Sequence, residues 1–250
     1  MPNLATLNTS GRIATLTLSR PDARNSLSLD LLASLHDRVG ELEQRSDVSV
    51  LIVTGEGKAF CAGMDLKAVL SDPTLPHALL SSLADLCLRI RNLAMVTVAK
   101  VNGAAIGGGC GLATVCDIAI THSDSKMGFP EVDLGVCPAV VAPWLVRKVG
   151  PGRARHILLS GGLMSGQQAF DIGIVNHVVP ARDDLDKATT EAAERLAKGG
   201  PNALRATKNL LNDLDGSMDE QLGQRAAALS AHVLSTPEAQ EMLRSKLAKQ

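Results

Sequence analysis

Aromatic side chains are almost absent from this chain of 250 residues, which contains three Phe, one Trp and no Tyr. An excess of charge of either sign is also missing, because 25 basic residues are matched by 26 acidic ones. Proteins that bind single-stranded nucleic acid use aromatic side chains as stacking platforms, and nucleic-acid-binding domains in general present a basic surface. The two absences together argue against a nucleic acid partner.

Long apolar runs are missing as well. No segment approaches the roughly 20 apolar residues that a membrane-spanning helix needs, and Met1–Thr9 lacks the charged region and apolar core of an export signal. The five cysteines are an odd set without a C-x-x-C pair or a cysteine–histidine spacing typical of zinc sites. We therefore expect a cytoplasmic protein with reduced cysteines, no membrane association and no metal site.

Glycine, in contrast, is concentrated in one stretch, Asn102–Gly111, which reads NGAAIGGGCG. A strand-like run, Val96–Val101, precedes it. A short apolar segment that could form two helical turns, Leu112–Cys116, follows, and then a second strand-like run, Asp117–Thr121. Glycine lets the backbone approach a ligand closely, and the start of a helix leaves N–H groups without partners. The stretch predicts a site for an anion, or for a carbonyl oxygen that becomes anionic during reaction.

Two common phosphate-binding motifs do not fit these glycines. In the dinucleotide-binding pattern counted from Gly107, the third required glycine falls on Leu112. The Walker pattern fails too, because Gly57 and Lys58 are followed by Ala59. Glycines that serve only close packing of the backbone are the remaining alternative.

Other segments of the chain accompany the glycine turn in a recognisable order. They are RPDARNSLS (Arg20–Ser28), FCAGMDL (Phe60–Leu66), VNGAAIGGGCGLATVCDIAI (Val101–Ile120), MGFPEVDLGVCP (Met127–Pro138) and, more weakly, LLSGGLMSGQQAFDIGIVNHVV (Leu158–Val179). Together they resemble the crotonase, or enoyl-CoA hydratase/isomerase, superfamily. The resemblance covers nearly the whole chain, and several linked motifs make it far more specific than one glycine pattern.

The resemblance implies an α/β fold, a crotonase-like spiral of ββα units followed by a C-terminal helical trimerisation region. We expect residues 1–190 to form the spiral core and residues 191–250 the helical region. The residue patterns agree, since strands such as Ile13–Leu18 and Val48–Val53 are predicted early, whereas helices dominate after Ala139. Early helices are predicted at Leu29–Gln44, with Ser28 as N-cap, and at His77–Asn92. Later elements are expected at Ala139–Val149, Arg153–Leu159, Ser165–Phe170, Ile174–Val179 (a strand), Leu185–Lys198, Ala203–Leu214, Asp219–Leu234 and Pro237–Leu247.

The resemblance also implies an acyl-CoA thioester substrate whose carbonyl oxygen is held by two backbone N–H groups, those of Met64 and Gly108. Each donor would contribute roughly 3–4 kcal/mol in an enolate-like state. Residues near the coenzyme A part are implied in the same way. Arg24 and Ser26 would lie near the adenosine end, Ala62, Asp65 and Leu66 along the adenine and pantetheine path, Lys67 near a phosphate, and Ile106 and Gly111 as further substrate contacts. A solvated side chain is the alternative for both Arg24 and Lys67.

One carboxylate of the family pattern is present and one is missing. Hydratases of the family use two glutamates, and the second corresponds to Glu131. The first would fall three residues after Gly108, where this chain has Gly111. Glu131, beside Pro130 and apolar neighbours, is expected to have a raised pKa that suits it to general acid/base catalysis.

Three functions are consistent with this pattern. The first is a 2-enoyl-CoA hydratase, including one for branched substrates such as methylglutaconyl-CoA. The second is a Δ3,Δ2-enoyl-CoA isomerase that shuttles a proton with Glu131 alone, and the third is a non-catalytic acyl-CoA-binding subunit. We favour the hydratase, with no cofactor beyond the coenzyme A of the substrate and with a homotrimer or homohexamer as assembly. Basic residues near the end, Arg244, Lys246 and Lys249, are candidates for contact with a neighbouring subunit's ligand.

Overall fold

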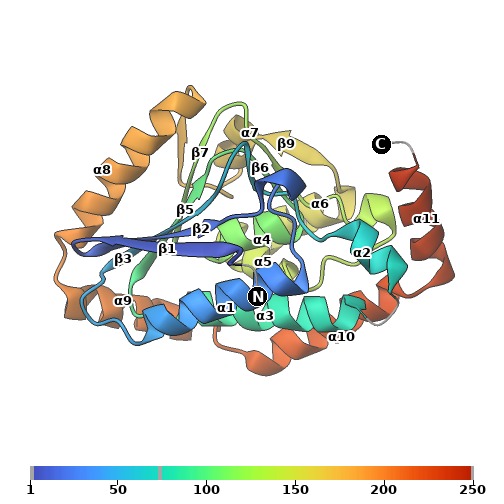
Figure 1. The fold of residues 1–250 in the computed structure, drawn as a ribbon, viewed down its shortest axis with the longest axis horizontal. Coiled ribbons are helices and arrows are strands. Elements are labelled where there is room, and N and C mark those ends of the chain that lie inside the picture. Colours follow the sequence, from blue (N-terminus) through green and yellow to red (C-terminus); the bar gives the residue numbers. More distant parts are fainter. Residues whose placement is uncertain (1–2, 73–74, 249–250) are drawn as a thin grey trace.

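The computed structural model describes residues 3–72 and 75–248. Its centre is a six-stranded sheet in the order β1-β2-β3-β5-β7-β10, in which only the β1–β2 pair is antiparallel (Figure 1). The sheet's strands are β1 (Ala5–Ser10), β2 (Ile13–Leu18), β3 (Val50–Gly55), β5 (Val96–Val101), β7 (Ile118–His122) and β10 (His177–Val179).

A second sheet of four short strands lies at one end of the first. Three of its strands directly follow a strand of the large sheet in sequence, so β3 leads to β4, β5 to β6 and β7 to β8. This repetition is the spiral that the sequence predicts, although strands of three residues are too short to show a period. The short strands are β4 (Ala59–Cys61), β6 (Ala104–Ile106), β8 (Lys126–Gly128) and β9 (Leu163–Ser165).

Helices cover both faces of the large sheet. The predicted N-cap Ser28 accepts a hydrogen bond from Leu31 N at 3.3 Å at the start of α1. α1, α3 and α4 pack in the main core, while α8 covers the other face with Leu185 and Ala193. The helices are α1 (Leu29–Glu43), α2 (Leu66–Ser71), α3 (Leu75–Asn92), α4 (Gly108–Val115), α5 (Ala142–Val149), α6 (Pro151–Ser160), α7 (Gly166–Asp171), α8 (Leu185–Ala197), α9 (Pro201–Leu214), α10 (Glu220–Leu234) and α11 (Pro237–Leu247).

Helix α4 begins earlier than the sequence suggests. The expected helical segment, Leu112–Cys116, is preceded by glycines that form the first helical turn themselves, so α4 starts at Gly108. Close packing requires this composition, because a Cβ on Gly109 would collide with the carbonyl oxygen of Cys61. The strand expected at Ile174–Val179 is also shorter and begins at His177.

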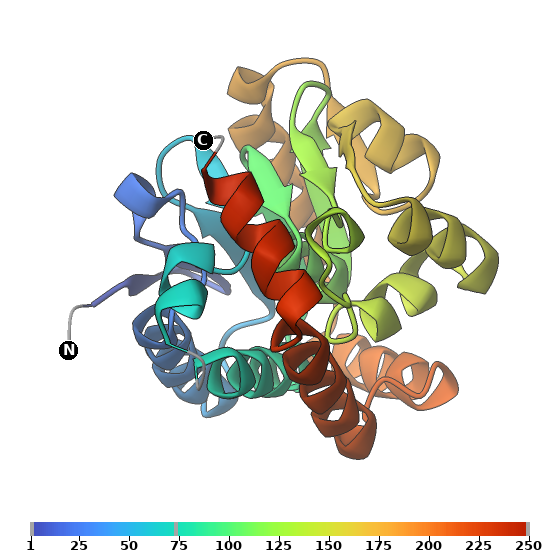
Figure 2. The ribbon, with the colours of Figure 1, turned by 90° about the vertical axis from the view of Figure 1, so that its right-hand side faces the viewer.

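The C-terminal helices return to the core. α10 packs along α3, and α11 packs against α2 and the short helix η2 (Val132–Leu134). Figure 2 shows α11, in red, crossing the front of the molecule. The division predicted after residue 190 falls inside α8 and stays a prediction. In the part of the chain that the structure describes, no helix is long and apolar enough to cross a bilayer.

Candidate active site

Two backbone N–H groups meet between the small sheet and α4. Gly63, with a φ of +87°, turns the chain after β4, and the amide of Met64 follows it. A Cβ on Gly63 would lie 2.7 Å from the carbonyl oxygen of Ile106 and 4.0 Å from Gly108 N, so only glycine fits there. The amides of Met64 and Gly108 donate to none of the described residues. They are two neighbouring free donors, one at the N-terminus of a helix.

Two buried asparagines hold the loop that leads to the first donor. Asn102 donates to the carbonyl oxygens of Gly55 at 2.8 Å and Gly57 at 3.1 Å, and accepts from Gly55 N at 3.2 Å. Asn25 donates to the carbonyl oxygen of Ala59 at 2.9 Å. The sequence gives no sign of these roles, since asparagine is also typical of ordinary turns and loops.

The carboxyl group of Glu131 lies against the glycine turn. A Cβ on Gly107 would lie 2.9 Å from Oε1 of Glu131, and Oε2 is buried without a hydrogen-bond partner among the described residues. Burial raises the pKa of Glu131 to about 7, and the nearby charge of Asp133 adds to the effect. A carboxyl group with this pKa is available in both protonation states near neutral pH. The raised pKa agrees with the expectation from sequence.

A small apolar cavity connects these groups. Its volume is about 30 Å³, the space of roughly two water molecules. Helices α3 and α10 contribute part of that wall. The cavity is lined by Leu27, Met64, Leu79, Leu80, Leu83, Gly108, Glu131, Val136, Cys137, Pro138, Val140, Val141 and Ser230.

The position of the missing glutamate is filled by another side chain. Gly111 is buried, and a Cβ built on it would lie 3.1 Å from Cβ of Val141 and closer still to its Cγ1. Val141 itself lines the cavity, whereas Gly111 does not. The chain therefore presents an apolar surface where the family pattern has its first carboxylate, and Gly111 lies behind that surface.

An arginine that the sequence did not single out engages two of the expected coenzyme A contacts. Arg20 donates to the hydroxyl of Ser26 at 3.0 Å and forms an ion pair with Asp65 at 3.0 Å. Asp65 also caps α2 by accepting from Ala68 N at 3.3 Å. Ser26 and Asp65 thus hold the two loops together on the side of the first donor.

The other expected contacts lie in the same corner. Ala62 N donates to the carbonyl oxygen of Arg24 at 3.0 Å, which fixes the arginine's loop beside β4. Arg24 and Lys67 are both exposed and form no ion pair with a described residue. Leu66 and Ile106 are half-buried between this corner and the core. Two exposed cations without an ion-pair partner can bind phosphate groups.

Other polar candidates near the site are inert or already engaged. Burial raises the pKa of the Cys61 and Cys110 thiols to about 12, so neither is a nucleophile near neutral pH. Asp133 accepts from Gly162 N at 2.8 Å. Arg244 belongs to α11, as does Lys246, and Lys249 lies outside the described residues. Within residues 3–72 and 75–248, no three His, Cys, Asp or Glu side chains gather as metal ligands.

The fold and these groups point to a class of protein, because two free amides and one buried carboxyl group lie around a single apolar cavity. Comparisons narrow the class. The family model described as enoyl-CoA hydratase/isomerase matches residues 8–247. The short-chain-enoyl-CoA hydratase of Clostridium acetobutylicum is 34% identical over 84% of this chain and 81% of its own. The crotonyl-CoA hydratase of Syntrophomonas wolfei subsp. wolfei is 36% identical over 81% and 78%.

Solved structures agree. An enoyl-CoA hydratase/isomerase from Xanthobacter autotrophicus Py2 superposes with a TM-score of 0.86 at 28% identity, covering 98% of this chain and 96% of that one. This chain belongs to the enoyl-CoA hydratase/isomerase family of the crotonase superfamily. It is an enzyme of the lyase or isomerase class with the expected α/β fold, which confirms the resemblance noted in the sequence.

The contact between Gly111 and Val141 gives a prediction on stability. Replacing Gly111 with Ala forces the new Cβ into Val141, and we expect the free energy of unfolding to fall by about 1–3 kcal/mol. In a protein that already carries Val141→Ala, the same Gly111→Ala change should cost much less stability, because the smaller side chain leaves room for the new Cβ. Urea denaturation of the four proteins measures the coupling.

A matched control is Gly152→Ala. Gly152 also lies in a helix, α6, but a Cβ there meets nothing within 4 Å, so alanine should stabilise or leave stability unchanged. Additive losses at positions 111 and 141 would contradict the packing described here.

The raised pKa of Glu131 gives a second prediction. The folded protein keeps a proton between pH 4.5 and about 7 that the unfolded chain has lost, so this group makes stability fall as pH rises through that range. Glu131→Gln removes the effect. Between pH 4 and pH 8, the free energy of unfolding of this variant should therefore rise relative to that of the wild type by up to about 3 kcal/mol. Urea denaturation at several pH values measures the difference; Glu191→Gln, at an exposed carboxylate, is the control. Parallel pH profiles for the wild type and Glu131→Gln would show that Glu131 titrates normally.

Proposed function

We propose that this enzyme adds water across the double bond of a 2-enoyl-CoA thioester, with Glu131 as its only carboxylic acid/base. The observation that carries the proposal is the position of the Glu131 carboxyl group, which lies against Gly107 beside the free amides of Met64 and Gly108. An acyl carbonyl oxygen held by both amides brings its α-carbon next to this carboxyl group. The hydratase names of several relatives support the same reaction.

One carboxyl group suffices for the proton balance. As a carboxylate, Glu131 takes a proton from water while the water oxygen bonds to the β-carbon of the substrate. Electrons move to the thioester oxygen, where the two amides stabilise the enolate. Glu131 then returns its proton to the α-carbon, and the enzyme is restored. A pKa of about 7 favours both steps, because neither protonation state is strongly disfavoured near neutral pH.

Isomerisation of a 3-enoyl-CoA is the second candidate, and the side chain of Val141 favours it. Val141 lies between the cavity and Gly111, the position where the family pattern has its first glutamate. No second carboxylate therefore orients a water molecule there. Glu131 would remove a proton from the α-carbon and return it to the γ-carbon through the same enolate. This route needs no water, and it suits an apolar cavity of about 30 Å³.

Neither reaction needs a cofactor beyond the coenzyme A of the substrate. The exposed cations Arg24 and Lys67 would hold its phosphates, with Ala62, Leu66 and Ile106 along the path to the donors. The acyl chain length and branching, including the methylglutaconyl-CoA-like alternative, are left open by this geometry. A cytoplasmic location remains a prediction from the cysteines.

We further propose that copies of this chain associate through α9, as a homotrimer or homohexamer. On this helix the polar side chains are buried and apolar ones are exposed. Lys208 and Asn212 face the protein and are only 6% and 3% exposed. Its leucines face outward, where a monomer would leave them in water. They are Leu210, Leu211 and Leu214, with exposed fractions of 57%, 55% and 74%. An apolar stripe opposite a docked polar face is typical of a subunit interface.

The reaction is tested by incubating the protein separately with a 2-enoyl-CoA and a 3-enoyl-CoA and separating the products by reversed-phase chromatography coupled to mass spectrometry, with authentic 2-enoyl-CoA and 3-enoyl-CoA as retention standards. A product of the 2-enoyl ester that gains one water supports the hydratase. A 3-enoyl ester that becomes 2-enoyl at unchanged mass, without hydration, supports the isomerase. Binding of both esters without reaction would contradict catalysis and favour the non-catalytic acyl-CoA-binding subunit.

Glu131→Gln should lower turnover at least about 100-fold, since general acid/base groups contribute about 10²–10⁴-fold, while the affinity for the thioester stays within a few-fold. For the wild type, kcat/KM should rise with pH up to about 7, because the carboxylate is the active form in the free enzyme. Rate measurements from pH 5 to pH 9 and binding by calorimetry test both points. A Gln variant with more than a tenth of wild-type activity would exclude the assigned role.

The assembly is tested by Leu210→Lys combined with Leu214→Lys. We expect analytical ultracentrifugation to show a shift from the oligomer to the monomer, because charges would be buried in the interface. Glu194→Lys, an exposed change on α8, is the control and should leave the mass unchanged. A wild-type protein that is monomeric at high concentration would rule out the interface.

A further inference from the structure

A second cavity lies at the opposite end of helix α4 from the amide of Gly108. It has a volume of about 190 Å³ and sits where β7 begins, at the C-terminal end of α4. The free amide of Gly108 is at the other end of that helix, about 12 Å away. The lining is mostly polar and charged. It consists of Arg91, Thr114, Asp117, Trp144, Arg147, Lys148, Gly173 and Asn176.

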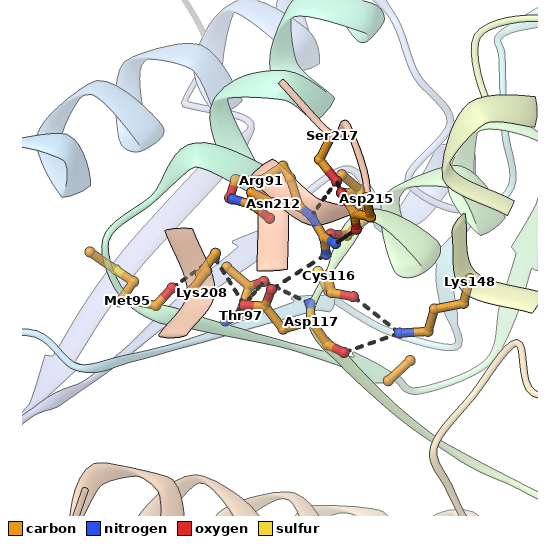
Figure 3. A network of polar contacts seen from close by, with 12 residues as sticks. Arg91, Met95, Thr97, Cys116, Asp117, Lys148, Lys208, Asn212, Asp215 and Ser217 are labelled. Carbon is orange, nitrogen blue, oxygen red and sulfur yellow. Dashed lines mark hydrogen bonds and ion pairs between the residues drawn. The ribbon is translucent and has the colours of Figure 1, made fainter. Parts of the chain in front are cut away.

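Asp117 is the only carboxylate in this lining, and its oxygens are fully engaged (Figure 3). Oδ2 accepts from the amide and hydroxyl of Thr97 at 2.8 and 2.9 Å and pairs with Lys208 at 2.9 Å. Oδ1 pairs with Arg91 at 3.4 Å. Arg91 reaches a second carboxylate, Asp215, at 2.8 Å. Lys208 and Arg91 therefore have counter-ions. The carboxylate of Asp117 is occupied by these two cations and Thr97, so it does not serve as counter-ion for a further cation.

Two further cations at the cavity lack such partners. Lys148 donates to the carbonyl oxygens of Cys116 at 3.2 Å and Asp117 at 3.1 Å. Arg147 donates to the carbonyl oxygens of Asp215 and Gly216. Among the described residues, no carboxylate lies within 4.0 Å of either cation. Burial lowers the pKa of both groups, as expected for charges that are only partly compensated.

Structural roles account for only part of this arrangement. Lys208 docks α9, because it also donates to the carbonyl oxygen of Met95 at 2.9 Å. Lys148 caps the C-terminus of α4, a favourable place for a cation. Capping and docking use hydrogen bonds, however, and leave the charge unbalanced. Four cations (Arg91, Arg147, Lys148 and Lys208) share two carboxylates at ion-pair distance, Asp117 and Asp215, and Asp219 acts on Arg147 only from farther away. The cluster therefore keeps an excess of positive charge.

We propose that this cavity binds a small dianion of the phosphate type. A dianion would balance the excess positive charge left by Arg147 and Lys148, which form no ion pair with a described residue. It would also accept hydrogen bonds from the remaining N–H groups of Arg147, whose guanidinium lies 5.2 Å from the ring centre of Trp144, and from Lys148. The planar guanidinium beside an ammonium is a common combination for phosphate oxygens. The site lies apart from Arg24 and Lys67, so a phosphate bound here is not a phosphate of the substrate.

The test measures thermal unfolding of the wild type with increasing sodium phosphate, at ionic strength held constant with sodium chloride. We expect a saturable rise of the melting temperature, which a ligand that binds only the folded state produces. Arg147→Gln and Lys148→Met should each weaken the apparent affinity for phosphate at least tenfold. Lys126→Met, at an exposed lysine on β8, is the matched control and should bind like the wild type.

A second arm separates free phosphate from coenzyme A. The titration is repeated with saturating coenzyme A, and the phosphate effect should persist, since the two sites are separate. Loss of the effect under coenzyme A would assign it to the substrate's phosphate site and overturn the proposal. The absence of a saturable effect in the wild type, or an unchanged effect in both variants, would overturn it as well. If Lys148→Met only weakened the oligomer and phosphate had no effect, the excess charge would belong to a subunit contact.

Discussion

The structure depends on one arrangement, the two unpaired amides of Met64 and Gly108 held beside each other. A backbone N–H without a partner is costly when buried, so the surrounding chain has to fix it in place. Asn102 and Asn25 hold the loop before β4, and glycine at position 63 permits the close approach. The ββα spiral brings the two donors, which lie 44 residues apart in the numbering of the chain, to the same place. Donors that are fixed beforehand stabilise a developing oxyanion without reorganisation.

The chemistry follows from what stands beside these donors. Glu131 is buried enough for its pKa to lie near 7, and Val141 fills the space that a second carboxylate would need. This site is therefore less polar than a site with two glutamates. One acid/base group still balances either hydration or isomerisation, because each reaction takes up and returns a single proton. Of the two proposed reactions, hydration needs a water molecule in the apolar cavity, whereas isomerisation needs none.

Helix α4 links the two ends of the molecule. Its N-terminus supplies the donor at the proposed active site, and its C-terminus is capped by Lys148 in the cationic cavity. The carboxylate of Asp117 joins β5, α3 and α9 through Thr97, Arg91 and Lys208. This network fixes α9 with its polar face inward and its leucines outward. The exposed leucine stripe of α9, on which the proposed assembly rests, is thus set by buried charges.

Much of this protein is determined by the sequence alone. The resemblance of its motifs predicts the family and the α/β fold, which are confirmed, and also the roles of Glu131 and the two amides, which stay predictions. Local patterns predict β2, β5 and α11 with their observed ends. Local rules succeed there because strand and helix periods, caps and linked motifs are written in neighbouring residues.

Tertiary structure decided the rest. The three-residue strands carry no period, the roles of Asn25, Asn102 and Arg20 depend on partners far along the chain, and Val141 fills the space at Gly111 only after folding. The charge imbalance around Lys148 likewise arises only when α3, α5 and α9 meet. Contacts between distant residues, and the burial that they produce, are properties of the packed chain.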